Sequence, residues 1–310
     1  MPSALLLVVG PTASGKTNLS IALAEQLNGE VVSADSVQIY RHFDIGSGKP
    51  TLQERRGVPH HLIDEVDAQT PIDAAQFAAL AEQRIQEIRG RGRLPIVCGG
   101  TFLWVRALIH GLAPAPPKDD SLRAQHRELV ELQGRAALHQ QLATVDASSA
   151  QRLSPNDFVR VSRALEVFQL TGKTLSELQA SHGFKEHKHR AILLGITHTP
   201  EALTARIETR VADMFARGWL DEVRSLRERG YRGTRPMAAV GYREVNAALD
   251  QTAAPEVPAL MASIVQKTRV FARRQRTWLR EQPVTWLSIA QSNDVAVGEQ
   301  ARALLETTSD

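Results

Sequence analysis

The sequence predicts an α/β fold in which a parallel sheet is flanked by helices and interrupted by an all-helical insertion. First, an apolar run is followed directly by the octapeptide Gly10-Pro11-Thr12-Ala13-Ser14-Gly15-Lys16-Thr17 and then by a helical pattern. Second, further apolar runs of strand length alternate with helical periods. Third, residues 117–187 contain helical periods alone. The predicted layout is a core formed by residues 1–116 and 188–310, with a helical carboxy-terminal part, around a helical insertion.

The octapeptide fits the pattern G-x-x-x-x-G-K-[ST] of a phosphate-binding loop. Residues 4–9 ahead of it have the composition of a strand buried on both faces. Residues 18–27 behind it place an apolar stripe on one side of a helix, formed by Leu19, Ala22, Leu23 and Leu27. Strand, loop and helix follow in the required order, so the sequence favours a P-loop NTPase-like core over a chance match.

The chemistry of this loop follows from its residues. Glycines let backbone N–H groups converge on an anion, the helix N-terminus adds its dipole, and Lys16 supplies a full positive charge. The hydroxyl of Thr17 is placed to ligate Mg²⁺. The motif does not identify the phosphate ester, because ATP, GTP and a diphosphate leaving group present the same oxygens.

A second strand is expected from Glu30 and ends near Asp35. Because parallel strands bring their carboxyl ends to one crevice, Asp35 is expected beside the phosphate loop. Its carboxylate is then a metal-site acid or a general base, or it caps the turn that follows. Gln38 and Tyr40 come next, on a loop from which they could reach an acceptor substrate.

A third strand is predicted over residues 94–98, after an amphipathic helix over residues 73–89. It delivers Gly99-Gly100-Thr101 to the same edge, with open backbone N–H groups and one hydroxyl. Cys98 is the only cysteine and is expected to be a buried small hydrophobic residue, which excludes an internal disulfide. The pair His60-His61 is expected to be structural, because adjacent strand residues point to opposite faces.

The composition of residues 111–120 indicates a linker out of the sheet domain. Within the insertion, Ser154 is predicted to cap the helix that carries Arg160 and Arg163 on its polar face. Two arginines on such a face are most simply a solvated surface. The apolar run 191–196 then resumes the sheet.

The carboxy-terminal third is expected to be helical and carries two sets of arginines. Arg206 and Arg210 lie one turn apart, where they can reach anionic oxygens or pair with acidic neighbours. Residues 260–280 contain no acidic residue and present a basic ridge formed by Arg269, Arg273, Arg276 and Arg280. Such a ridge fits a phosphate backbone and is the strongest indication of nucleic acid in the chain.

The overall charge adds nothing to that indication, since 37 basic and 34 acidic side chains leave a formal net charge of +3. No basic segment precedes the first apolar run, which is too short to span a bilayer. A cytoplasmic protein without a targeting signal is therefore expected. No interface pattern stands out, so a monomer is the default assembly.

The ordered motifs resemble those of bacterial tRNA dimethylallyltransferases, also called tRNA isopentenyltransferases. The resemblance runs from residue 4 to about residue 287. Six blocks carry it: the octapeptide, residues 33–40, 44–50 and 60–64, the segment from Asn156 to Glu166, and residues 273–278. The chain departs from the family just after Gly-Gly-Thr, where a Gly and a Tyr are usual and this chain has Phe102 and Trp104.

The resemblance implies transfer of a dimethylallyl group from dimethylallyl diphosphate to N6 of adenine 37, in tRNAs that read codons beginning with U. It implies that the octapeptide, Arg210 and a Mg²⁺ held through Thr17 stabilise the diphosphate leaving group. Lys16, Asp35 and Thr101 are then the catalytic residues, with Asp35 as general base and Thr101 orienting the amine or the donor.

The resemblance also implies that the adenine leaves the anticodon-loop stack, so the enzyme binds single-stranded RNA. The extruded base and its neighbours are expected to meet Asp35, Ser36, Val37, Gln38 and Thr101. The anticodon loop is expected to meet Arg123, Val159, Arg160, Val161, Ser162 and Arg163. The stem is expected to meet Val240, Gly241, Tyr242, Arg243, Arg273, Arg274, Gln275, Arg276 and Arg280.

Two other classes stay open on the residues alone. A small-molecule or nucleotide kinase would share the phosphate loop and the acid after the second strand, but it would need arginines over the γ-phosphate and would consume ATP. An RNA-binding module with a vestigial nucleotide site would bind tRNA without forming a product.

Overall fold

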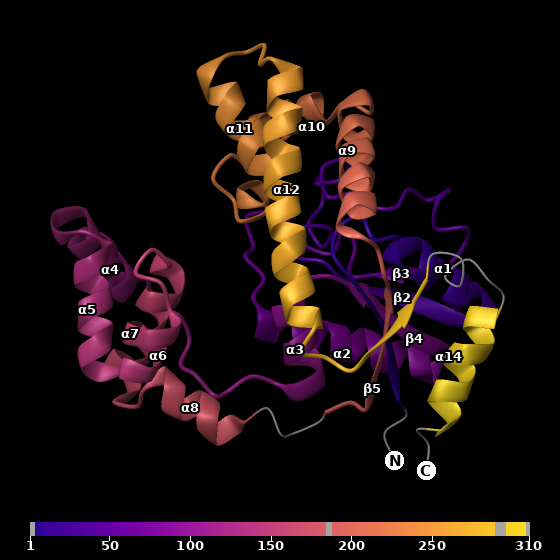
Figure 1. Ribbon diagram of the computed structural model, residues 1–310, viewed down its shortest axis with the longest axis horizontal. Helices are drawn as coiled ribbons and strands as arrows, with labels where there is room; N and C mark the ends of the chain where they lie inside the picture. Colours follow the sequence, from indigo (N-terminus) through magenta and orange to yellow (C-terminus); the bar gives the residue numbers. More distant parts are fainter. Residues whose placement is uncertain (1–3, 184–187, 289–295, 308–310) are drawn as a thin grey trace. The chain divides into compact units, whose positions relative to one another are not determined.

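The computed structural model describes residues 4–183, 188–288 and 296–307 (Figure 1). The chain divides into two compact units, one formed by Met1–Ile109 and Lys188–Asp310 and the other by His110–His187. We call them the sheet unit and the helical unit and describe each by itself. The last residues of the predicted insertion, 184–187, lie outside the described residues.

The sheet unit is built on a parallel sheet, as the sequence predicts. In the described residues the strands stand in the order β3-β2-β4-β1-β5-β6, and every neighbouring pair is parallel. β1 lies between β4 and β5 and is buried along its whole length, which is why its sequence is apolar throughout. The bounds are β1 Leu5–Val9, β2 Gly29–Ala34, β3 His60–His61, β4 Leu94–Gly99, β5 Ala191–Ile196 and β6 Val284–Leu287.

Helices flank this sheet. α1 (Lys16–Leu27) and α14 (Ala296–Thr307) pack together on a hydrophobic cluster that includes side chains of β1, β2, β4 and β5. Cys98 belongs to this cluster and is 8% exposed, which confirms that it is a buried hydrophobic residue. α2 (Ala74–Gly90) packs against β2 and β4, and α3 (Phe102–His110) follows β4.

Beyond β5 the chain forms a group of helices at one end of the sheet (Figure 1). α9 (Pro200–Ala216) and α12 (Val257–Leu279) pack side by side, and α10 (Trp219–Glu228) and α11 (Tyr242–Gln251) contact them. A short 3₁₀ turn, η1 (Pro236–Ala238), precedes α11. Within the described ranges no helix combines the length and the apolar character needed to cross a membrane.

The helical unit is formed by short helices around a small apolar core. Leu138 and Leu142 of α5 pack there with Val161, Ala164 and Leu165 of α7. Its described residues contain no strand, in agreement with the helical periods of the sequence. The bounds are α4 Asp120–Gln133, α5 Arg135–Val145, α6 Ala147–Arg152, α7 Phe158–Thr171 and α8 Leu175–His182.

The start of α7 differs from the prediction. We expected Ser154 to cap this helix, but the cap is Asp157, whose carboxylate accepts a hydrogen bond from the N–H of Arg160. Ser154 accepts instead from the N–H of Asn156 and holds the turn before the helix. Both residue types are good caps, and the carboxylate has the further advantage of meeting the positive end of the helix dipole.

Glu166 is the buried charge that joins α4 to α7. Its side chain is 0% exposed, and it accepts hydrogen bonds from the guanidinium groups of Arg123 and Arg163 and from the N–H of Asp119. Burial raises the pKa of this carboxyl, but hydrogen bonds from the two arginines outweigh burial and lower the pKa to about 2. The prediction that Arg163 lies on a solvated face is therefore wrong, since its guanidinium is drawn in to a buried carboxylate.

We expect Glu166→Gln to lower the free energy of unfolding of the helical unit by roughly 3 kcal/mol at pH 7, because two partly buried arginines lose their counter-charge. A carboxyl whose native pKa is lowered stabilises the fold above its unfolded pKa, and this stabilisation is lost as the pH falls from about 4.5 towards 2. Urea unfolding at several pH values should show the difference between variant and wild type shrinking in acid.

The matched control is Arg160→Ala, which breaks an exposed ion pair with Asp157 and should cost less than about 1 kcal/mol. A Glu166→Gln deficit that stayed constant from pH 7 down to pH 2 would contradict the ion-pair explanation.

Candidate active site

The phosphate-binding loop lies between the end of β1 and the start of α1. Gly15 precedes the helix with a φ of 93°, a left-handed conformation that favours glycine, and no side chain caps the helix. The first-turn N–H groups of α1 are therefore available to an anion. The Ser14 hydroxyl is buried without a partner in the described part of the chain, as expected of a group that binds a ligand. Gly10 is needed to make room, since a Cβ there would lie 2.6 Å from Ser14 Oγ.

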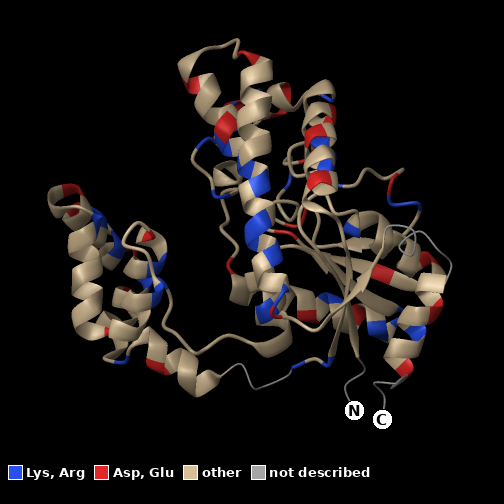
Figure 2. Cartoon of the chain, in the orientation of Figure 1, with Lys and Arg blue, Asp and Glu red and all other residues tan. Residues whose placement is uncertain are grey.

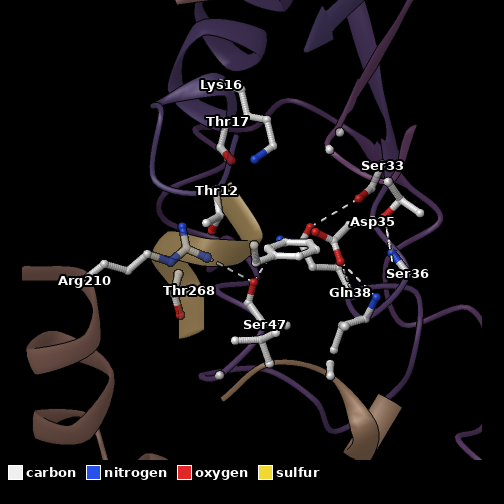
Figure 3. Close-up of a pocket in the computed structure, with 18 of the residues that line it drawn as sticks. Thr12, Lys16, Thr17, Ser33, Asp35, Ser36, Gln38, Ser47, Arg210 and Thr268 are labelled. Atoms are coloured by element: carbon white, nitrogen blue, oxygen red, sulfur yellow. Dashed lines mark hydrogen bonds between the residues drawn. The ribbon is translucent and has the colours of Figure 1, made fainter. Parts of the chain in front are cut away.

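A cavity of about 330 Å³ opens beside this loop and collects residues from distant parts of the sheet unit (Figure 3). Lys16 and Thr17 come from the start of α1, Asp35 follows β2, Thr101 follows β4, and Arg210 lies on α9. The first four meet because parallel strands end at the same edge of a sheet. The structure thus brings together the residues that the sequence proposes for catalysis and for binding of diphosphate.

The rest of the cavity wall is largely apolar. Three side chains of α9 that line it are almost fully buried: Ile207, Val211 and Met214 are 1%, 3% and 6% exposed. Trp219, Val240, Ile264 and Phe271 continue the wall along α10, the segment before α11, and α12. A cavity with cations beside an apolar wall suits a substrate that joins an anion to a hydrocarbon.

Two cations share the cavity with one carboxylate. Burial lowers the pKa of both Lys16 and Arg210, and the charge of Asp35 opposes that shift in both. Arg210 donates to the carbonyl oxygen of Ser47 at 3.2 Å, and a Cβ on Gly48 would lie only 1.9 Å from its guanidinium. Gly48 therefore gives Arg210 its path into the cavity.

Asp35 serves both a turn and the cavity. Its Oδ1 accepts hydrogen bonds from the N–H groups of Val37 at 2.9 Å and Gln38 at 3.2 Å, so it does cap the turn. Its Oδ2 has no donor among the described residues and is left for a ligand. Thr101 is fixed beside it, because its Oγ1 accepts from the N–H of Ser36 at 3.1 Å.

Residues from the carboxy-terminal part hold the phosphate loop in place. Arg206 pairs with no acid among the described residues, and its Nε donates to the carbonyl oxygen of Ala13 at 2.7 Å. His198 Nε2 donates to the carbonyl oxygen of Ser14 at 2.8 Å. Both contacts satisfy carbonyls on the loop and take up none of its N–H groups.

Gln275 corrects one of our predictions. We expected it on the surface that meets a tRNA stem, but its side chain is 6% exposed. Its Oε1 accepts from the N–H of Thr12 at 2.8 Å, and its Nε2 donates to the carbonyl oxygen of Gly100 at 2.9 Å. Gln275 therefore belongs to the phosphate loop and joins it to the Gly-Gly-Thr segment.

Four other residues expected to meet tRNA are buried within their own units. Val161 and Ser162 are 1% and 3% exposed, and the Ser162 hydroxyl pairs with His126. Tyr242 is 1% exposed and donates its hydroxyl to Glu222, while a Cβ on Gly241 would lie 2.3 Å from Trp219. We predicted that consecutive residues all contact tRNA, whereas a helix exposes only some residues of any consecutive run.

The exposed candidates are fewer. Arg160 keeps a side chain that is 71% exposed, and Val159 next to it is also 71% exposed. Arg123 and Arg163 are 23% and 25% exposed and are committed to Glu166.

The basic ridge follows α12 to its C-cap residue Arg280, and Figure 2 shows Lys and Arg along the helix. Arg269, Arg273 and Arg280 are exposed and Arg276 is partly buried, and Arg274 beside them is exposed as well. Within residues 4–183, 188–288 and 296–307 none of these five forms an ion pair. Their positive charge is therefore available to a polyanion.

The two departures from the family motif pack beside Thr101. Phe102 stacks on Trp278 with ring centroids 4.2 Å apart, and Trp104 stacks on Phe77 at 4.4 Å. Both are buried, and neither lines the cavity. The larger side chains therefore fill space behind Thr101 and do not form part of the cavity wall.

The two adjacent histidines differ. His61 pairs with Glu30 at 2.6 Å, in line with the structural role expected of it. His60 lines the cavity, which we did not predict, and its Nε2 is buried without a partner in the described ranges. Burial lowers the pKa of His60, which favours the neutral ring.

A divalent cation would depend on substrate oxygens at this site. The described residues contain no group of three or more His, Cys, Asp or Glu side chains that could hold a metal ion by themselves. The hydroxyl of Thr17 lines the cavity next to the anion-binding loop. Mg²⁺ usually takes few protein ligands and completes its shell with phosphate oxygens and water, so these residues fit it.

Together these features define a P-loop α/β protein whose cavity places cations beside an apolar wall. Comparisons with known proteins identify its family. The family model described as IPP transferase matches residues 38–282. The tRNA dimethylallyltransferase of Sorangium cellulosum (strain So ce56) is 57% identical over 290 residues, which cover 93% of this chain and 91% of that protein. The chain belongs to the IPP transferase family, and it is a prenyltransferase.

Solved structures agree with this assignment. The full-length tRNA isopentenylpyrophosphate transferase from Bacillus halodurans is 36% identical, with a TM-score of 0.73 over 99% of this chain and 98% of that one. A eukaryotic dimethylallyltransferase acting on tRNA is 28% identical, with a TM-score of 0.74 over 97% of this chain and 77% of that one.

We expect Gln275→Ala to weaken binding of inorganic diphosphate about tenfold, because the Thr12 N–H and the Gly100 carbonyl lose a buried partner. Isothermal titration of the purified variants measures this. The control is Thr277→Ala, an exposed position on the same helix that should bind diphosphate like wild type. Equal affinities for all three proteins would show that the loop holds its geometry without Gln275.

Proposed function

We propose that this chain transfers the dimethylallyl group of dimethylallyl diphosphate to N6 of adenine 37, in tRNAs that read codons beginning with U. The products are N6-(dimethylallyl)adenosine and diphosphate. The observation that carries the proposal is one cavity that combines an anion-binding loop, two cations, a carboxylate oxygen without a partner and an apolar wall. The names of its relatives support the same reaction.

The donor gives up diphosphate from an allylic carbon. As the C–O bond breaks, positive charge spreads over the allyl unit and negative charge gathers on the leaving group. We assign Lys16, Arg210 and the loop N–H groups to the diphosphate, where fixed donors in a buried site stabilise the developing charge. The α9 wall of Ile207, Val211 and Met214 then covers the hydrocarbon and keeps water from the cation.

The acceptor amine is a poor nucleophile, because its lone pair is delocalised into the purine ring. We assign Asp35 as the general base: Oδ2 takes the proton from N6 as the new N–C bond forms. The turn hydrogen bonds to Oδ1 hold the carboxylate in place meanwhile. Thr101 orients the amine or the donor from the neighbouring loop.

Mg²⁺ is the proposed cofactor. Thr17 would hold it together with diphosphate oxygens and water, in keeping with the few protein oxygens at the site. When bound, the ion neutralises charge on the leaving group.

The acceptor base must leave the anticodon-loop stack to reach a cavity inside the sheet unit. We propose that the basic ridge, Arg274, Val240 and Arg243 hold the stem, and that Ser36, Val37 and Gln38 meet the extruded base and its neighbours. The helical segment 117–187 is the proposed anticodon-loop module, with the exposed Arg160 and Val159 as its contacts. Because tRNA resides in the cytoplasm, we place the reaction there and take a monomer as the working unit.

The deciding experiment incubates the purified protein and Mg²⁺ with an unmodified tRNA that has adenines at positions 36 to 38. One sample receives dimethylallyl diphosphate and the other ATP, and the nucleosides are then identified by digestion and mass spectrometry. We expect a prenylated adenosine with the diphosphate donor alone. ATP hydrolysis without a modified nucleoside would favour a kinase or a regulated RNA-binding module.

Asp35→Asn is the sharpest test of the general base, because the amide oxygen keeps the two turn hydrogen bonds while the basic oxygen is lost. We expect kcat to fall by about 10² to 10⁴ and the affinity for tRNA to stay unchanged. Single-turnover assays and filter binding measure the two quantities. A loss of tRNA affinity as large as the loss of rate would remove Asp35 from that role.

Salt dependence tests the basic ridge. Replacing Arg273 and Arg274 by Ala should weaken tRNA binding and reduce the slope of log affinity against log salt by about 1 for each arginine that contacts a phosphate. The control pair is Arg224→Ala and Arg227→Ala, whose guanidinium groups already pair with Asp221 and Asp250. Identical slopes for wild type and the Arg273–Arg274 double variant would show that these two arginines do not contact the phosphates of the tRNA stem.

A further inference from the structure

Phe271 both lines the active-site cavity and meets solvent, with 41% of its surface exposed. The apolar wall residues contributed by α9 are buried, whereas Phe271 on α12 is partly exposed, so Phe271 stands at the rim of the cavity rather than inside it. In the described part of the chain its ring stacks on no other aromatic ring. One part of the ring is therefore covered by protein and another part is exposed to water.

The surroundings of Phe271 are those of a polyanion site. Thr268 and Gln275, one turn away in each direction, line the same cavity. Arg274 is also one turn away, is exposed and forms no ion pair within the described ranges. An exposed aromatic ring flanked by uncompensated arginines is the combination with which proteins bind single-stranded nucleic acid, since bases stack on the ring and phosphates meet the cations.

We propose that Phe271 is a stacking platform for the nucleotide base that flanks the extruded adenine. This inference rests on the proposed function, because it requires an RNA acceptor at the cavity. The extruded adenine must reach Asp35 Oδ2 within the cavity, so the base that remains at the rim is its neighbour in the strand. The ring of Phe271 then holds the strand at the point where it turns into the cavity.

The alternative occupant is the hydrocarbon of the donor, and burial argues against it. Ile207, Val211 and Met214 present an apolar wall that is at most 6% exposed, on the same helix as Arg210. A hydrocarbon on that wall is kept from water, whereas one on Phe271 would stay partly hydrated. A planar base has polar edges that can remain wet while one face stacks.

The test is a set of three variants. Phe271→Ala removes the ring, Phe271→Trp keeps an aromatic face, and Val270→Ala is the matched control. Val270 is the preceding residue on α12, is 42% exposed against 41% for Phe271, and does not line the cavity. We expect Phe271→Ala to raise KM for tRNA about 5- to 100-fold and to leave KM for dimethylallyl diphosphate within twofold of wild type. Phe271→Trp should restore KM for tRNA, and Val270→Ala should match wild type.

A double-mutant cycle identifies the base. Anticodon stem–loop RNAs carry an abasic nucleotide on one side or the other of the target adenine, and their affinities for wild type and Phe271→Ala are compared. At one of the two positions the abasic RNA should bind both proteins equally, because the partner of the ring is already gone. Additive losses at both positions, or a raised KM for the donor instead of tRNA, would overturn the proposal.

The two levels of inference fail separately. A wild-type protein that forms no prenylated adenosine would defeat the proposed function and this inference with it. A wild-type protein that forms the product, together with a Phe271→Ala variant that has normal KM for tRNA, would defeat the stacking platform alone.

Discussion

The geometry of the phosphate loop depends on side chains that reach it from the far end of the chain. The octapeptide supplies N–H groups for an anion, but three partners fix where they point: Arg206 on the Ala13 carbonyl, His198 on the Ser14 carbonyl, and Gln275 on the Thr12 N–H. Gln275 extends the constraint to Gly100, next to Thr101. The conformation of a motif that is local in the sequence thus depends on tertiary contacts. Gln275 holds both the phosphate loop at the donor site and the segment next to Thr101 at the proposed acceptor site.

Burial divides the arginines of this chain into two kinds. Arg123 and Arg163 pair with the buried carboxylate of Glu166, which neutralises part of their charge inside the helical unit. The arginines of the basic ridge form no ion pair within the described residues, and all but the partly buried Arg276 are exposed. A net charge of +3 therefore understates the attraction for a polyanion, because the attraction depends on where uncompensated cations gather rather than on their sum.

The sequence predicts strands β1, β2, β4 and β5 and the phosphate side of the cavity, because those signals are local or follow from one rule. It does not predict β6, a strand within the carboxy-terminal third that we expected to be helical. The octapeptide is contiguous, and Asp35 and Thr101 are placed by the common edge of parallel strands. Contacts between distant residues decide the rest. Gln275 lies within a basic run that gives no sign of its link to Thr12, and His60 has no sequence feature that places it in the cavity. The cap of α7 is Asp157 and not the predicted Ser154, because the folded turn, which the sequence pattern does not define, places the carboxylate at the helix start.

The strand order has a consequence for synthesis of the protein. β1 pairs with β4 on one side and with β5 on the other, and β5 is made only after the whole helical unit. A chain growing on the ribosome therefore carries an unpaired edge of β1 over that interval, and such an edge is open to pairing with other chains. The nascent phosphate loop also lacks His198, Arg206 and Gln275 until late in translation. The chain thus completes its phosphate-binding site only near the end of its own synthesis. A prematurely terminated fragment contains the octapeptide but lacks the residues that hold it in its binding conformation.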